Sequence, residues 1–118
     1  PLVLVGDGAF QMTGMEISTA VRYGLAPIVV VLDNAGYGTE RPMVDGAFND
    51  VQPWAFAELP RVIGGGHGYD VSTESAFEAA LAQALATRDE LAVIHVRLAG
   101  DDISPALARL TSQLGKRV

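Results

Sequence analysis

The stretch PLVLVGDG, residues 1–8, runs through five apolar residues into a turn in which two glycines flank an aspartate. A second stretch, LAPIVVVLDN at residues 25–34, repeats this order with a β-branched apolar run and two polar residues after it. Short apolar runs without polar alternation are typical of strands buried on both faces of a parallel sheet, and these runs are too short to cross a membrane. The two stretches therefore predict parallel strands that each end in a polar turn.

The segment between these strands has the features of the helix that a parallel crossover needs. Residues 12–23 have helical character, and Gly24 with Pro27 soon after it is a normal helix stop. The two strand ends then lie side by side at the carboxyl edge of an open α/β sheet, where ligands bind. Asp7 and Asn34, which follow the two strands, are therefore expected to face one point.

Later segments extend the same architecture. An apolar stripe predicts a helix that begins near Thr73, and residues 91–98 predict another buried strand. Ser104 and Pro105 predict the cap and first turn of a last helix, with Gly115 after its end. The stripe, spaced i, i+3, i+4, i+7 and i+8, consists of Phe77, Ala80, Leu81, Ala84 and Leu85. We therefore expect an α/β fold with a doubly wound, mostly parallel open sheet and helices on both faces.

The two histidines are expected to have structural surroundings. The stretch GGGHG at residues 64–68 precedes the short strand expected at residues 69–71, so it predicts a flexible connection rather than a phosphate-binding loop, with His67 in the loop. His95 lies inside a strand pattern without a second histidine or a cysteine near it in sequence. This pattern indicates a core or edge histidine whose hydrogen bonds are satisfied.

The polar residues after the strands suggest a metal site. Asp7 and Asn34 offer a carboxylate and an amide carbonyl, and the backbone carbonyl of Gly36 is a candidate third ligand. Mg²⁺ prefers oxygen ligands of this kind and usually completes its shell with phosphate oxygens and water. A diphosphate is therefore expected beside the metal.

The backbone near Asp7 is suited to an anion. Gly6 and Gly8 let the chain approach a phosphate closely because they carry no Cβ. The free amide groups at the start of the next helix, from about Ala9 to Thr13, are expected to point at the anion. Gly-x-Gly alone is a weak signal, since the third glycine of a dinucleotide fingerprint and a phosphate-loop lysine are both missing. In isolation the two motifs would indicate only a strand-to-helix turn and a polar loop.

Together the two motifs resemble the diphosphate-binding motif of thiamine-diphosphate-dependent enzymes. GDGAFQMT at residues 6–13 and NAGYGTE at residues 34–40 look like the 2-oxo acid decarboxylase branch, with its pyruvate, indolepyruvate and phenylpyruvate decarboxylases. DGAFNDVQPW at residues 45–54 is similar to a further segment of those enzymes. The resemblance runs from about Leu2 to Leu114, which is nearly the whole chain.

This resemblance implies two cofactors and one reaction. Thiamine diphosphate would be bound by Gly6, Asp7, Gly8, Ala9, Asn34, Gly36 and Tyr37, and Mg²⁺ by Asp7, Asn34 and Gly36. The implied reaction is the non-oxidative decarboxylation of a 2-oxo acid, a small molecule, to an aldehyde. Because this is the cleavage of a carbon–carbon bond, the implied class is a lyase.

Glu40 is the catalytic candidate. In the decarboxylases the matching glutamate reaches the substrate, assists the release of carbon dioxide and handles protons, whereas acetolactate synthases usually carry an apolar residue there. A carboxyl near an apolar pocket has a raised pKa, which suits such a role. The alternative is a solvated loop glutamate paired with Arg41.

Three positions depart from the pattern of the decarboxylases. Asp33 stands where they often have a first asparagine, and Ala35 and Gly38 replace bulkier or polar residues. None of these changes removes a predicted metal ligand. They leave open the shape of the substrate pocket and the identity of the 2-oxo acid.

Composition limits the remaining possibilities. A chain of 118 residues with 49% hydrophobic residues is expected to form one core and one domain over residues 1–118. Its net charge of −6 argues against nucleic acid or an anionic membrane as a partner. The absence of cysteine and of a signal sequence or membrane-spanning run fits a cytoplasmic protein.

The chain is expected to be part of a longer polypeptide, because it begins without methionine inside a motif strand. The resemblance implies missing N-terminal domains of the same polypeptide, a homodimer or homotetramer, and no turnover by the fragment alone. Two alternatives remain. One is a carboligase or lyase of the acetolactate synthase or benzoylformate decarboxylase type, and the other is a non-catalytic module that binds metal and diphosphate.

Overall fold

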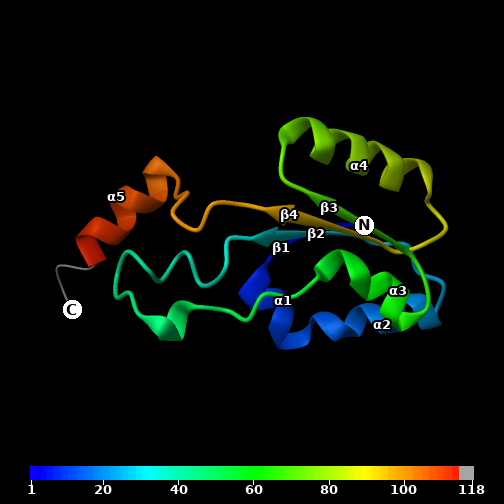
Figure 1. Ribbon diagram of the computed structural model, residues 1–118, viewed down its shortest axis with the longest axis horizontal. Helices are drawn as coiled ribbons and strands as arrows, with labels where there is room; N and C mark the ends of the chain where they lie inside the picture. Colours follow the sequence, from blue (N-terminus) through cyan, green and yellow to red (C-terminus); the bar gives the residue numbers. More distant parts are fainter. Residues whose placement is uncertain (115–118) are drawn as a thin grey trace.

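Four parallel strands form a single open sheet in the computed structural model, which describes residues 1–114 (Figure 1). The strands are β1 (Leu2–Gly6), β2 (Ile28–Asp33), β3 (His67–Val71) and β4 (Ala92–Arg97), and their order in the sheet is β1-β2-β4-β3. All three neighbouring pairs are parallel. The α/β prediction is confirmed, and β2 and β4 are the central strands.

Helices cover both faces of the sheet (Figure 1). One face carries α4 (Glu74–Ala86), and the other carries α1 (Asp7–Thr13), α2 (Ile17–Arg22) and α3 (Leu59–Ile63). A last helix, α5 (Pro105–Leu114), lies beyond the carboxyl ends of the strands. Short 3-10 turns occupy Gly14–Glu16, Ala47–Asn49 and Phe56–Glu58.

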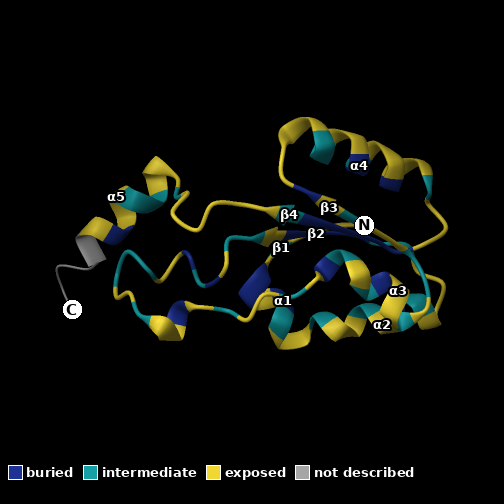
Figure 2. Cartoon of the chain, in the orientation of Figure 1, coloured by how far each residue is buried: buried dark blue, intermediate teal, exposed yellow. Residues whose placement is uncertain are grey.

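The core consists of two apolar layers separated by the sheet. Alternate side chains of a strand point to opposite faces, so the continuous apolar run of β2 contributes to both layers. Under α4 the buried residues are Ile28, Val30, Val71, Ala80, Ala84, Ala92 and Ile94. On the opposite face they are Phe10, Val29, Val31, Phe56, Leu91 and Val93. Burial is accordingly concentrated in the two central strands (Figure 2).

The helix predicted for residues 12–23 is instead divided into two. Helix α1 begins already at Asp7, and a 3-10 turn at Gly14–Glu16 separates it from α2. At the junction Thr13 has φ −142°, outside the helical range, and the Phe10 ring packs directly against Gly14. The Phe10 ring is thus buried in the core, and the helix is interrupted where the ring packs against Gly14.

The other boundaries agree closely with expectation, with one correction. Thr73 caps α4 by accepting the Ala76 amide at 3.2 Å, and Ser104 caps α5 by accepting the Leu107 amide at 3.1 Å. His67 was expected in a loop but is the first residue of β3, since its amide donates to the Leu91 carbonyl at 2.8 Å. Gly115, predicted to follow the last helix, lies outside the described residues.

The molecule is elongated, with principal extents of 49 × 28 × 21 Å. The loop between β2 and α3 and the segment that carries α5 both extend beyond the carboxyl ends of the strands (Figure 1). Among residues 1–114, none of the helices has the length and apolar character needed to span a bilayer.

Candidate functional site

A cavity of about 290 Å³ lies at the carboxyl ends of β1 and β2. Because β1 and β2 pair in parallel with Gly6 opposite Leu32, the residues that follow the two strands emerge next to each other. The lining residues are Gly6, Asp7, Gly8, Ala9, Leu32, Asn34, Gly36, Tyr37, Gly38, Thr39 and Leu98. All seven residues predicted to bind the cofactor therefore lie around one cavity, whereas Glu40 does not line it.

Three oxygen atoms come together in this cavity. The side-chain oxygen of Asn34 lies 3.3 Å from Asp7 Oδ1 and 2.8 Å from the carbonyl oxygen of Gly36. A rotation of the amide by 180° exchanges its oxygen and nitrogen, and the nitrogen then donates to the same two oxygens; without a cation this rotated orientation is the favoured one, because it satisfies both contacts. Without a donor or a cation between them, three acceptors at these distances repel one another. A carboxylate, an amide oxygen and a backbone carbonyl are a donor set that Mg²⁺ accepts.

Asp7 is the buried charge of the site, with a relative exposure of only 3%. Burial raises the pKa of its carboxyl above the ordinary value of 3.8, and the nearby Asp33 carboxylate raises it further. Hydrogen bonds from the amides of Gly8 and Gly36 oppose this rise. An ionised Asp7 is therefore disfavoured by its surroundings, and a cation beside it would remove much of that penalty.

A tight turn after β2 presents the other two oxygens. Asp33 Oδ1 accepts the Ala35 amide at 3.1 Å, and Ala35 adopts a left-handed φ of 62°. Gly36 follows with φ 148°, and a side chain there would collide with the Asn49 carbonyl. Glycine is therefore required at position 36, where the backbone turns back toward Asp7.

The wall of the cavity next to α1 is formed by Tyr37. A Cβ on Gly8 would lie 2.7 Å from Cε1 of the Tyr37 ring, so the ring packs directly on the first turn of the helix. Since α1 begins at Asp7, its free amides belong to residues 7–10. The expected amide range, Ala9 to Thr13, overlaps this turn only in part.

Glu40 lies close in sequence to the cavity but outside its lining. It is exposed, in a turn where its amide donates to the Tyr37 carbonyl at 3.0 Å. The pairing with Arg41 that we considered as an alternative is not formed in the described structure. Arg41 instead contacts Asp45 at 3.0 Å and Asp50 at 2.7 Å.

Sequence reasoning missed two features of the site. Leu98, just after β4, lines the cavity because β4 lies next to β2 in the sheet. Asp33 Oδ2 is bonded at 2.6 Å to Nε2 of His95, which is 1% exposed. The core placement predicted for this histidine is confirmed, but its hydrogen bonds are only partly satisfied, because Nδ1 has no partner within residues 1–114. The identity of the Nε2 partner depends on strand order, which has no local sequence signal.

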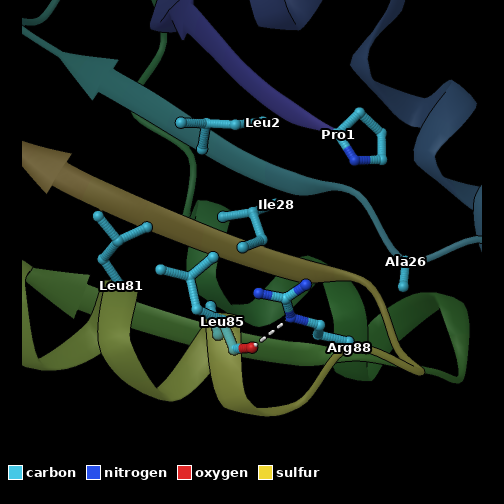
Figure 3. Close-up of a pocket in the computed structure, with 8 residues that line it drawn as sticks. Pro1, Leu2, Ala26, Ile28, Leu81, Leu85 and Arg88 are labelled. Atoms are coloured by element: carbon cyan, nitrogen blue, oxygen red, sulfur yellow. Dashed lines mark hydrogen bonds between the residues drawn. The ribbon is translucent and has the colours of Figure 1, made fainter.

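A larger cavity of about 470 Å³ lies at the opposite end of the sheet, between α4 and the amino ends of β1 and β2 (Figure 3). Apolar side chains such as Leu2, Ile28, Leu81 and Leu85 surround it, and Nε of Arg88 donates to the Leu85 carbonyl at 3.0 Å. Few polar groups converge there, so we place the site at the carboxyl end. Within residues 1–114 no three His, Cys, Asp or Glu side chains form a metal cluster.

The sequence matches one family profile over residues 1–96, described as "Thiamine pyrophosphate enzyme, C-terminal TPP binding domain". An indole-3-pyruvate decarboxylase of Azospirillum brasilense is 40% identical over 109 residues, which cover 92% of this chain and 20% of that protein. A thiamine metabolism regulatory protein of Saccharomyces cerevisiae is 34% identical over 113 residues, covering 90% of this chain and 18% of that protein.

A solved structure also resembles the chain. Benzoylformate decarboxylase from Polynucleobacter necessarius aligns with a TM-score of 0.76 and 24% identity over 88% of this chain and 20% of that one. At this identity the likeness shows the fold alone. The chain spans about a fifth of the length of the curated relatives described above. Because the family profile covers most of the chain, the chain belongs to the thiamine pyrophosphate enzymes, as their C-terminal TPP binding domain.

Proposed function

We propose that the full-length protein containing this chain is a thiamine-diphosphate- and Mg²⁺-dependent 2-oxo acid decarboxylase that forms an aldehyde. The observation that carries this proposal is the convergence of the Asp7 carboxylate, the Asn34 amide group and the Gly36 carbonyl in a cavity at the carboxyl edge of the sheet. The 40% identity to an indole-3-pyruvate decarboxylase supports the reaction class. In this proposal the chain contributes the diphosphate and metal site, and residues 1–118 form a single domain.

The predicted site residues divide into those that would hold the metal ion and those that would hold the diphosphate. Asp7, Asn34 and Gly36 would hold Mg²⁺ through oxygen. The first turn of α1, with Gly6, Gly8 and Ala9, would accept the diphosphate through backbone amides, and the Tyr37 ring would close one side. When bound, thiamine diphosphate supplies the electron sink for the loss of carbon dioxide.

Glu40 is proposed as the proton-handling residue. It follows the turn that carries the metal ligands, and its carboxylate is not occupied by Arg41, which binds Asp45 and Asp50. Because it does not line the cavity of this chain, its working position would be completed by parts of the protein outside the chain. The carboxyl would then deliver or remove a proton at the reacting carbon.

The decisive experiment measures carbon dioxide release from pyruvate, phenylpyruvate and indolepyruvate by the full-length protein with thiamine diphosphate and Mg²⁺. Asp7→Ala is expected to abolish cofactor binding. Glu40→Gln should retain binding and lose turnover by about 100-fold or more, as expected for removal of an acid–base group. Glu78→Gln, which removes an exposed carboxylate of α4, is the matched control and should behave as wild type.

Each failure has a distinct meaning. Wild-type protein that binds the cofactor without releasing carbon dioxide from any 2-oxo acid would contradict decarboxylation. Full activity of Glu40→Gln would contradict only the role of that residue. Formation of a ligated ketol in place of an aldehyde would favour the carboligase alternative.

A second function is favoured by one observation. A relative with 34% identity is named a thiamine metabolism regulatory protein. A domain similar to this chain is therefore also found in a protein named for regulation. A regulatory module of this kind would bind thiamine diphosphate and Mg²⁺ without turnover. It would depend on Asp7 and be indifferent to Glu40→Gln.

We further propose that the protein acts in the cytoplasm and assembles as a homodimer or homotetramer, with further N-terminal domains on the same polypeptide. The lack of cysteine is compatible with the cytoplasm. The exposed apolar side chains of β1, including Leu2 and Leu4, favour contact with another part of the assembly. Sedimentation of the full-length protein as a monomer with bound cofactor would contradict the oligomer.

A further inference from the structure

We propose that His95 is a positioning residue for the metal site and acts through Asp33. The inference rests on the proposed function, because it concerns the same metal ligands. It adds two residues that touch neither the cavity nor the expected metal, and it explains how the turn carrying Asn34 and Gly36 is held in place.

The sheet brings His95 and Asp33 to the same face. Val31 of β2 lies opposite His95 of β4, and Asp33 follows two residues after Val31, so its side chain points to the same side. His95 Nε2 and Asp33 Oδ2 are 2.6 Å apart. The Phe56 ring packs edge-on against the imidazole at 5.1 Å, on the face covered by α1, α2 and α3.

The direction of this hydrogen bond follows from the chemistry of the partners. An ionised carboxylate only accepts, so the Nε2–H group of His95 is the donor to Asp33. The other ring nitrogen, Nδ1, is buried and finds no hydrogen-bond partner within the described structure. Its nearest charged neighbour is Asp70 Oδ2 at 3.9 Å. The Asp33 bond is therefore the polar contact that orients the ring.

The two oxygens of Asp33 have different partners. Oδ2 accepts from His95, and Oδ1 accepts the amide of Ala35 at 3.1 Å. Asp33 thereby connects the rigid centre of the sheet to a residue in the left-handed region, with φ 62°. Because Ala35 separates Asn34 from Gly36, the orientation of the Asp33 carboxylate determines where both of their oxygens lie.

The charge of Asp33 makes this restraint necessary. Asp33 lies close enough to Asp7 to raise the pKa of that carboxyl, so the two carboxylates repel each other. The hydrogen bond from His95 to Oδ2 of Asp33 holds the carboxylate in its orientation against this repulsion. Loss of the donor is expected to let Asp33 rotate and to release the turn.

The test measures Mn²⁺ binding to the full-length protein, with and without thiamine diphosphate, from the electron paramagnetic resonance signal of free Mn²⁺. His95→Leu should weaken Mn²⁺ binding about 10- to 100-fold, the range for loss of a group that orients a ligand. His95→Gln places an amide donor near the position of Nε2 and should restore most of the affinity. His67→Leu, at the start of β3 and paired with Glu90, is the control and should bind as wild type.

Asp33→Ala tests the same interaction from its other partner. It does not replace a fully buried residue, since the Asp33 side chain is 15% exposed. It should weaken Mn²⁺ binding by a similar factor, and adding His95→Leu to it should have little further effect, because both changes remove one interaction. Full additivity of the two changes would overturn the proposal. So would wild-type affinity in either folded single variant, or a failure of His95→Gln to bind better than His95→Leu.

The outcomes separate this inference from the proposed function. If the wild-type protein itself fails to bind Mn²⁺ with thiamine diphosphate, the proposed function is wrong and the role of His95 is wrong with it. If the wild type binds and the His95 and Asp33 variants bind equally well, only the positioning role is wrong.

Discussion

Two glycines decide the shape of the site, because neighbouring groups approach their backbone more closely than a Cβ would allow. Gly8 supports the Tyr37 ring on the first turn of α1, and Gly36 turns the chain beside the Asn49 carbonyl. Asp7 is predictable from sequence because its place after an apolar strand is local information. The rise in its pKa, in contrast, depends on burial in the folded chain and, to a smaller extent, on Asp33, which strand pairing brings close to it.

The first residue-scale prediction concerns Gly8→Ala. The added methyl group would lie 2.7 Å from Cε1 of Tyr37, so the ring must move away from α1. Overpacking typically costs about 1–3 kcal/mol, and we expect the dissociation constant for thiamine diphosphate to rise about tenfold in calorimetric titrations at saturating Mg²⁺.

Gly6→Ala is the matched comparison for this prediction. Gly6 has φ −74°, and a Cβ there meets no atom within 4 Å. We therefore expect it to weaken binding less than Gly8→Ala. Equal effects of the two substitutions would contradict the argument from the Tyr37 contact.

Among the elements, the loop between β2 and α3 has its own hydrogen-bond network. The guanidinium of Arg41 contacts Asp45 at 3.0 Å, Asp50 at 2.7 Å and the carbonyls of Ala35 at 3.2 Å and Asn49 at 3.4 Å. Asn49 is itself buried and donates to the Val44 carbonyl at 2.8 Å. One side chain thus connects the turn at Ala35 to residues 45–50 of the same loop.

Arg41→Met should loosen this loop without unfolding the sheet. We expect hydrogen exchange of residues 35–50 in the full-length protein to speed up by on the order of tenfold, because their backbone contacts lose a shared partner. Arg41→Lys should not restore protection, since an ammonium group cannot form the forked contacts of a guanidinium. Arg61→Met, which breaks the exposed pair with Glu58, is the control and should leave this region unchanged.

The edge strand β3 is connected to β4 by a pair whose strength depends on pH. Hydrogen bonds from Arg97 hold the pKa of the Asp70 carboxyl below its ordinary value of 3.8. A carboxyl with a lowered pKa in the folded state stabilises the fold above its unfolded pKa, and this contribution is lost as the pH falls through the folded value.

Arg97→Met should therefore lower the thermal midpoint at neutral pH, and the difference from wild type should vanish once the pH falls well below about 3.8. The effect should be small, because both side chains are about half exposed. Arg88→Met is the control: its Nε donates to a carbonyl and it has no ion pair in the described part of the chain. A difference that persists in acid would contradict the assignment to Asp70.

On the scale of the whole molecule, the edge strand β1 exposes three consecutive large apolar side chains, Leu2, Val3 and Leu4. Its only sheet neighbour among the described strands is β2, and Leu2 and Leu4 are 56% and 66% exposed. An exposed apolar edge strand favours pairing with another chain. The isolated chain is therefore not expected to remain a well-behaved monomer.

We expect the 118-residue chain expressed by itself to self-associate, and Leu4→Lys to reduce the association, because a lysine on an edge strand opposes pairing. Sedimentation velocity over a range of concentrations measures this directly. Leu110→Lys, at an exposed position of α5, is the comparison and should have less effect. A monomeric wild-type chain would contradict the prediction.

The sequence by itself determined the strand–turn–helix units, the helix cap at Thr73 and seven of the residues around the cavity, because apolar runs, capping residues and glycine turns act locally. The break at Gly14 was missed, since it depends on where the Phe10 ring packs. Only the tertiary structure decided that β4 lies beside β2, which places Leu98 at the cavity and His95 against Asp33 across 62 positions of sequence. Strand order is a choice among long-range pairings of similar apolar runs, and only their packing into one core distinguishes them.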